Sequence, residues 1–175
     1  MASPTLTAAL DYASLGCATH PLCSPTQRGA CGCGWGHELK KVGKAPRTGN
    51  GVKDATTDLS ALQTMWRPCP QSNIGIALET SGLMLVGPDS PEWLVKFQRH
   101  GLPDTAWAHS GGGEGHRHYY YRTPQGCPTW RINKPGEYDI QTAGYAVAPP
   151  SIHRSGRKYT WVQELPDSLE KLPFP

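Results

Sequence analysis

The sequence predicts a mixed α+β domain in which helices come early and strands dominate later. The chain has 175 residues, enough for one domain with a core of its own. Its 20 glycines and 17 prolines suit many short strands joined by turns better than a helical bundle. The order of helical and strand patterns along the chain favours a mixed sheet with helices packed on it.

The expected helices are marked by capping residues. Ser3 precedes a Pro at the first helical position and an apolar stripe that ends at Gly16. Asp58 caps the segment LSALQTMW, and Ser90 caps PEWLVKFQRH, which Gly101 ends. Near the end of the chain, PDSLEKL is a short helix.

The expected strands are short and rich in apolar, β-branched or aromatic residues. They are CATHPL, NIGIALE, LMLV, TAWAHS, HRHYYYR, YDIQ, YAVAP and KYTWVQ. A Ser81-Gly82 turn separates NIGIALE from LMLV, and we expect these two to form a hairpin.

Charge and hydropathy exclude few function classes. The formal net charge is +3, which neither requires nor opposes a polyanionic partner. No run approaches the ~18 apolar residues of a membrane helix, so we expect no membrane partner. The first residues lack a basic segment and include Asp11, unlike a secretory signal, and we expect a cytoplasmic protein.

Residues 23–51 form a Cys-, Gly- and Lys-rich segment that is longer than an ordinary connection. Four of its side chains are candidate zinc ligands, because tetrahedral zinc prefers thiolate and imidazole donors and can hold a loop without periodicity: Cys23, Cys31, Cys33 and His37. Cys17 and His20 are rival ligands, and unligated thiols in a reducing compartment are the other interpretation. Cys69 and Cys127 are expected to be packing residues.

The segment HSGGGEGHRHYYYR combines a glycine loop with a strand. Glycines let the backbone approach anionic oxygens closely, so the loop is a candidate phosphate cradle made by Ser110, Gly111, Gly112 and Gly113. Strand alternation then places His116 and His118 on one face, with Arg117 on the other. Arg117 is a further candidate for binding the phosphates of a nucleotide. A glycine hairpin followed by an aromatic strand is the plain structural alternative.

Two aspartates are candidates for a metal site. Asp89 follows the strand LMLV in GLMLVGPDSPEW, and Asp139 lies in YDIQ. If the two are neighbours across the sheet, they can bind Mg²⁺ or Mn²⁺ together with the phosphates of a triphosphate. Lys44, Arg47 and Lys53 lie in a loop that can gather around a phosphate chain, or else form an ordinary basic surface.

The order of these motifs resembles the bifunctional DNA primase/polymerase (prim-pol) N-terminal domain of the archaeo-eukaryotic primase superfamily. The motifs are ALDYA, GKAPRT, GVKDATTD, NIGIA, the acid-bearing strand end, SGGG, RHYYY, YDIQTAGYAVAPPSIH and SGRKY, from about residue 10 to residue 161. The resemblance implies one two-part domain over residues 1–175 whose catalytic half has an RRM-like antiparallel or mixed sheet flanked by helices. It also implies a place in a longer replication protein.

The resemblance also implies residue roles and a reaction. Asp89 and Asp139 match acids that hold two metal ions, and His118 matches a histidine that binds a phosphate. The implied reaction is template-directed nucleotidyl transfer on single-stranded DNA from nucleoside triphosphates, including starts without a primer. A helicase domain or other replication proteins are the implied partners.

The chain departs from the family at the first acid motif. The family has two acids one residue apart, and here Gly87 stands at the first of them and Asp89 at the second. We expect a genuine loss of one acid, although Glu79, Glu92 or Glu137 can be considered as substitutes, or Asp89 can take the first place and Glu92 the second. Gln141 and Ala143 also stand where the family often has Arg and Gly.

Three functions therefore compete. The first is an active primase/polymerase, impaired by Gly87. The second is an inactive prim-pol fold that binds nucleotide or DNA in replication or its regulation, and the third is a nucleotide-dependent nuclease or transferase. Bases can stack on aromatic side chains in each of them, although aromatic residues in strands are more often core: Trp66, Trp107, Tyr119 and Tyr121.

Overall fold

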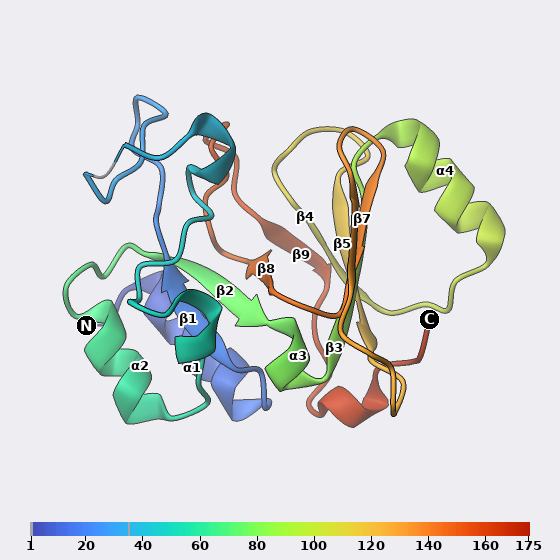
Figure 1. The fold of residues 1–175 in the computed structure, drawn as a ribbon, viewed down its shortest axis with the longest axis horizontal. Coiled ribbons are helices and arrows are strands. Elements are labelled where there is room, and N and C mark those ends of the chain that lie inside the picture. The colour runs from blue at the N-terminus through green and yellow to red at the C-terminus, as the bar shows by residue number, and fades with distance from the viewer. Residues whose placement is uncertain (1, 35) are drawn as a thin grey trace.

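Two antiparallel sheets, each with its own helices, form the computed structural model, which describes residues 2–34 and 36–175 (Figure 1). The smaller sheet has the strand order β1-β2-β8 and the larger one β6-β7-β3-β5-β4-β9. The expected α+β class is confirmed. No helix among the residues described is long and apolar enough to cross a bilayer.

The smaller sheet consists of β1 (Thr19–Leu22), β2 (Asn73–Ala77) and β8 (Tyr145–Ala148). Helices α1 (Pro4–Ser14) and α2 (Leu59–Trp66) pack beside it. Their expected caps are present, because the side chain of Ser3 accepts from the Leu6 N–H and that of Asp58 from the Ala61 N–H. Two 3₁₀ turns, η1 (Leu39–Lys41) and η2 (Gly51–Asp54), lie in the long connection between β1 and α2.

The larger sheet consists of six strands, and most of it lies toward the right of Figure 1. They are β3 (Leu83–Pro88), β4 (Ala106–His109), β5 (Arg117–Arg122), β6 (Arg131–Lys134), β7 (Tyr138–Gln141) and β9 (Thr160–Gln163). Helix α4 (Pro91–His100) covers its outer face, and the short helix α3 (Leu78–Ser81) links β2 to β3. A 3₁₀ turn, η3 (Leu169–Lys171), lies near the end of the chain.

One apolar core joins the two sheets. It combines side chains of α1 and α2 with the inward side chains of β2, β3 and β5, among them Trp66, Ile74, Leu85 and Tyr120. A chain of two hydrogen bonds connects α1 to β9. The Trp161 Nε1–H donates to the Tyr12 hydroxyl at 2.7 Å, and that hydroxyl donates to the Pro149 carbonyl. The shared apolar core therefore fixes the position of the two sheets relative to each other.

Two details differ from the sequence-based expectation. Residues 73–77 and 83–88 do not form a hairpin, because β2 pairs with β1 and β8 while β3 pairs with β5 and β7. The segment 78–81 turns into a helix instead and carries the chain from one sheet to the other. Strand β6 was not expected, and its four residues are all exposed, so they carry no burial pattern.

Candidate active site

The candidate site lies where strand β3 ends between β5 and β7. The pairing of β3 with β7 sets Gly87 opposite Asp139. One step further, Asp89 forms an isolated bridge with His116, and its N–H donates to the Glu137 carbonyl at 2.9 Å. The sheet thus brings together two acids that are 50 residues apart in the chain.

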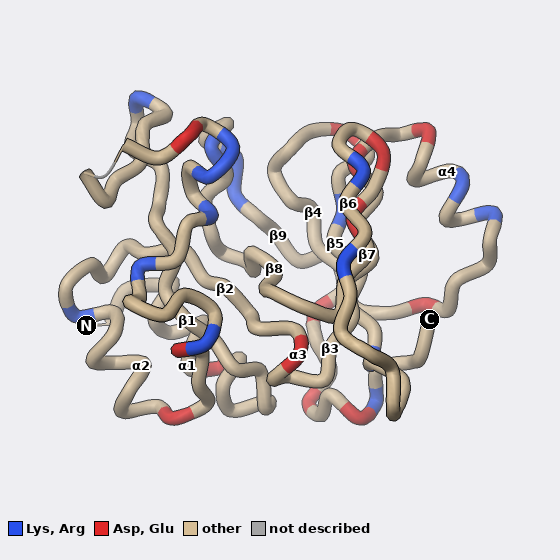
Figure 2. The backbone as a smooth tube through the Cα atoms, viewed as in Figure 1, with Lys and Arg blue, Asp and Glu red and all other residues tan. Residues whose placement is uncertain are grey.

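A cavity of about 290 Å³ opens at this place. It is strongly polar, with two carboxylates, four cations and three histidines on its walls. These residues are Asp89, Asp139, Lys40, Lys44, Arg131, Arg154, His116, His118 and His153. Figure 2 shows Lys and Arg on the segment around η1 and on β6, the two elements that supply Lys40 and Arg131. The excess of cations over acids suits a polyanionic ligand such as a triphosphate.

Asp89 is partly buried and its Oδ1 lies 3.4 Å from the Nδ1 of His116. Burial raises the pKa of the Asp89 carboxyl, and the charge of Asp139 also raises it, while His116 acts in the opposite direction. A cation between two carboxylates in a shared cavity stabilises their charged forms.

Asp139 has one carboxylate oxygen engaged and one unengaged. Its Oδ2 accepts from the Arg131 guanidinium at 3.2 Å. Its Oδ1 is buried and has no hydrogen-bond partner within the part of the chain that the structure describes. A buried carboxylate oxygen of this kind fits a divalent cation, because Mg²⁺ and Mn²⁺ prefer oxygen donors and take their remaining ligands from water and phosphate.

No glutamate joins the two aspartates on the described walls of the cavity. Glu79 lies on α3, on the link between the two sheets, and Glu92 is exposed and paired with Lys96 at 2.8 Å. Glu137 lines a separate depression beside α4 together with Glu92. The three candidate substitutes for the missing acid therefore all lie outside this cavity.

Gly87 occupies a position from which a side chain would enter the cavity. It lines the cavity with Leu85 and Asp89, its neighbours two residues away along β3, as strand alternation requires. A Cβ atom at Gly87 would lie 3.4 Å from the carbonyl oxygens of Arg117 and Asp139 and 3.8 Å from the His118 ring, which is ordinary contact. The site has room for the acid that the chain lacks.

His118 is held in the neutral state. Burial, assisted by the charge of Lys44, lowers the pKa of the His118 imidazole to about 3. Its Nδ1 is buried and unpartnered within the described residues. Desolvation at the cavity wall lowers the pKa of the Lys44 ammonium group, although the charge of Asp89 opposes that effect. The hydroxyl of Tyr145 donates to the Lys44 carbonyl at 2.8 Å and fixes this loop over the cavity.

The expected phosphate-binding residues divide into two groups. Ser110 and Gly112 line the cavity, as does Lys44, whereas Arg47 and Lys53 do not. Gly111 has a φ of +72°, and a Cβ atom there would lie 2.8 Å from the Cβ of His153, so the loop has no space for a side chain at this position. Gly113 has a positive φ of 138°. This loop therefore depends on glycine for its shape.

Arg117 lies on the other face of β5, as strand alternation predicts. Its guanidinium carbon lies 4.3 Å from the centroid of the Trp107 ring. Trp107 in turn stacks on Tyr119 at 5.7 Å on this outer face. Arg117 is thus remote from the cavity walls, and of the four aromatic candidates for base stacking, Trp66 and Tyr121 are buried.

Several cavity residues were not found from the sequence. Lys40 lies in the 3₁₀ turn η1, Arg131 on an exposed edge strand and Arg154 in a loop, where single cations follow no sequence pattern. Tyr159 belongs to the quoted motif SGRKY. His153 belongs to the quoted motif VAPPSIH, and that motif was the signal available for it. Burial lowers the pKa of His153 to about 4, and Lys44 contributes to the same shift.

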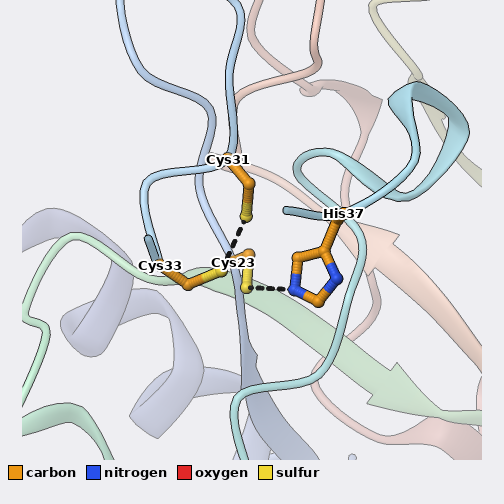
Figure 3. A group of neighbouring side chains, drawn as sticks. All are labelled: Cys23, Cys31, Cys33 and His37. Atoms are coloured by element: carbon orange, nitrogen blue, oxygen red, sulfur yellow. Dashed lines mark hydrogen bonds between the residues drawn. The ribbon is translucent and has the colours of Figure 1, made fainter. Parts of the chain in front are cut away.

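The four expected cysteine and histidine ligands converge in the 23–51 segment (Figure 3). Their donor atoms all lie within 4.8 Å of one another. The sulfurs of Cys31 and Cys33 are 3.0 Å apart, and the Cys23 sulfur lies 3.7 Å from the His37 Nε2. Neither Cys17 nor His20, the rival ligands, belongs to this group. Three sulfurs and one imidazole nitrogen form the donor set that tetrahedral zinc takes.

The fold and the site together indicate a class of protein. Two sheets enclose a cationic cavity that contains a pair of carboxylates, an arrangement that nucleotide-transferring proteins use. The family model described as bifunctional DNA primase/polymerase, N-terminal, matches residues 9–174, and the chain belongs to this family. No protein of curated function matches the chain. The resemblance read from the sequence motifs is thereby confirmed.

Proposed function

We propose that this domain joins nucleotides on a single-stranded DNA template, using nucleoside triphosphates and Mg²⁺ or Mn²⁺. One observation carries the proposal: Asp89, Asp139, His118 and Lys44 come from four separate segments and line the same cavity. Membership of the primase/polymerase family supports the same reaction.

The cavity residues take different roles according to their charge. Asp89 and Asp139 would hold the divalent cation, which when bound neutralises charge on the triphosphate and favours ionisation of the attacking 3′-hydroxyl. Lys44, Lys40 and Arg154 bind phosphate oxygens through charge-assisted hydrogen bonds. Neutral His118 donates one N–H to a phosphate oxygen, and Arg131 keeps the Asp139 carboxylate in place.

Gly87 makes the expected reaction slow. With two carboxylates on the described walls instead of three, the cavity lacks a negatively charged ligand of a two-metal site. Each ~1.4 kcal/mol of lost transition-state stabilisation is a factor of ten in rate, so a loss of a few kcal/mol lowers the rate by orders of magnitude. We expect Mn²⁺ to support the reaction better than Mg²⁺, because Mn²⁺ binds a given site more tightly.

The composition of the cavity walls also favours a second candidate function, a nucleotide- or DNA-binding module without catalysis. Besides the missing acid, each remaining acid contacts a basic group of the protein, Asp89 with His116 and Asp139 with Arg131. A cavity organised in this way binds a triphosphate chiefly through its cations and needs the metal less.

Primer extension separates the two functions. Wild-type protein is incubated with Mn²⁺, deoxynucleotides and a primed single-stranded template, beside Asp139→Asn and the control Glu137→Gln, which alters an acid outside the cavity. Catalysis predicts extension by the wild type and the control and at least a 100-fold lower rate for Asp139→Asn. If the wild type makes no product and no dinucleotide, the catalytic function fails. A binding module then predicts that Asp139→Ala leaves DNA affinity unchanged or raises it.

We also propose that the cysteine cluster holds a structural zinc ion. The support is the donor set of Cys23, Cys31, Cys33 and His37 and their mutual distances. The ion would fix a connection that has little regular structure of its own. Thiolates of this kind persist in a reducing compartment, so we place the protein in the cytoplasm. Metal analysis of protein purified without chelator is expected to give about one zinc per chain, and well under one equivalent contradicts the proposal.

A further inference from the structure

A second, smaller cavity of about 170 Å³ adjoins the first one. The two share six wall residues, among them Lys44, His118 and Asp139, so they lie side by side. The smaller part adds the side of the hollow made by Gln141 and by the start of β8.

Gln141 is a buried polar residue with unused hydrogen-bonding capacity. Its side chain is 3 % exposed, and its Nε2 lies 3.5 Å from the Tyr145 carbonyl to which it donates. Its Oε1 is buried and accepts no hydrogen bond from any described residue. Such a buried carbonyl costs free energy unless a partner reaches it, so the group indicates a ligand.

The unpartnered acceptor of Gln141 is placed next to another one. Gln141 and Asp139 lie two residues apart on β7, and both line the smaller cavity. The buried Oδ1 of Asp139 and the Nδ1 of His118 also lack partners among the residues described. Three unsatisfied polar atoms therefore belong to the wall residues of one small hollow, where a polar ligand would supply their missing partners.

The unpartnered atom of Gln141 is its carbonyl oxygen, which cannot pair with a phosphate oxygen. At neutral pH the oxygens of a triphosphate accept hydrogen bonds, and a carbonyl oxygen has no proton to give them. The partner must carry an O–H or N–H group. Lys44 and Arg131 lie on the walls that the two cavities share, and their positive charges suit the phosphates. The part of the ligand that reaches Gln141 is therefore the part bonded to the phosphates.

In a nucleoside triphosphate, the part that follows the phosphates is the sugar. Its hydroxyl groups donate hydrogen bonds whichever base is attached, whereas the donors of the bases differ from base to base. A template-directed enzyme has to accept all bases at one site, so a fixed contact to the sugar is compatible with the reaction and a fixed contact to a base is not.

We propose that Gln141 is a specificity-determining residue whose Oε1 accepts a hydrogen bond from a sugar hydroxyl of the bound nucleotide. The inference rests on the proposed function, since it places a nucleotide in the cavity. It assigns the smaller hollow as the sugar subsite.

Nucleotide affinities test the subsite without requiring turnover. Dissociation constants are measured with Mn²⁺ for one nucleotide in four forms: ribose, 2′-deoxy, 3′-deoxy and 2′,3′-dideoxy. The proteins are the wild type, Gln141→Leu, which keeps the size but lacks the oxygen, and Gln163→Leu, a glutamine control on the outer face of the sheet. We expect the wild type and Gln163→Leu to bind at least one hydroxylated form about three- to tenfold more tightly than the dideoxy form, the size of one hydrogen bond. Gln141→Leu is expected to bind all four forms equally.

A further variant and the contrary outcomes keep the test decisive. Gln141→Glu retains an acceptor oxygen and is expected to keep the preference for the hydroxylated form at lower overall affinity, which decides the matter if Gln141→Leu does not fold. Equal wild-type affinities for all four forms, or an unchanged preference in Gln141→Leu, overturn the sugar contact while nucleotide binding itself stands. Failure of the wild type to bind any form overturns both the subsite and the proposed function.

Discussion

Restoring the missing acid by the substitution Gly87→Asp is the sharpest perturbation that the site offers. The backbone at Gly87 is not in the left-handed region, and a Cβ atom there meets its nearest neighbours at 3.4 Å. The substitution therefore introduces no strain, and a side chain on this strand costs less backbone entropy than glycine by roughly 0.5–1 kcal/mol. The new carboxylate enters the cavity beside Asp89 and Asp139.

The expected size of the effect follows from electrostatics. Two unit charges 4 Å apart attract by about 4 kcal/mol at an effective dielectric constant of about 20. A divalent cation doubles this attraction to about 8 kcal/mol. Repulsion from Asp89 and Asp139 and desolvation of the new carboxylate offset most of it, which leaves roughly 2–3 kcal/mol for binding the metal ion. We expect Gly87→Asp to bind Mn²⁺ about 30- to 100-fold more tightly and to extend a primer faster by a similar factor. Without metal the variant should be less stable, because three acids then share one cavity.

The assay combines a Mn²⁺ titration, followed by thermal unfolding, with single-nucleotide extension rates. Gly87→Asn controls for the shape of the new side chain and Gly87→Ala for the change in backbone entropy. If Gly87→Asp and Gly87→Asn bind Mn²⁺ and extend primers alike, the carboxylate adds nothing, and the assignment of this strand end as a depleted metal site is refuted.

Three further predictions concern stability and metal content. Tyr12→Phe breaks the buried hydrogen-bond chain that begins at Trp161 and should lower the free energy of unfolding by about 1–3 kcal/mol, as measured by urea denaturation; an unchanged midpoint would rule out a structural role for the hydroxyl. Burial lowers the pKa of His20 to about 4, so the folded state binds fewer protons than the unfolded state between about pH 6.5 and pH 4, and stability is complete above this range and falls as the pH is lowered through it. This residue alone should cost about 2 kcal/mol between pH 7.5 and pH 5, and His20→Phe should lose less than the wild type over that interval, a difference that two denaturation curves reveal or disprove. Cys31→Ser should lower the zinc content and the melting temperature, whereas Cys69→Ser, outside the cluster, should change neither; equal zinc in both proteins would argue against the cluster as the binding site.

The helices and most strands could be predicted because their signals are local. Ser3, Asp58 and Ser90 cap helices within three residues of their own positions, and the capping hydrogen bonds are present. The division of the strands into two sheets could not be predicted in this way. Strand β2 pairs with β8, about 70 residues later, rather than with its neighbour β3, and such long-range pairing depends on the packed core.

The site was predictable to the extent that it lies in ordered motifs. Asp89, Asp139 and His118 each follow or occupy a recognisable strand, and the structure brings all three to one cavity. Arg131 lies on an exposed edge strand, and its contact with Asp139 arises only when β6 pairs with β7. The unsatisfied oxygen of Gln141 is likewise a property of burial, which the sequence pattern around it does not reveal.

Both proposed functions place a nucleotide in the cavity. They differ in their need for the metal ion, which is greater for the catalytic function. The most direct measurement is nucleotide affinity with Mn²⁺ and after chelation, for the wild type and for Asp139→Asn. A metal site at Asp89 and Asp139 predicts that chelation weakens nucleotide binding to the wild type at least tenfold, and that Asp139→Asn binds nucleotide weakly whether or not Mn²⁺ is present. Equal affinity in all four cases would contradict a metal site at Asp89 and Asp139.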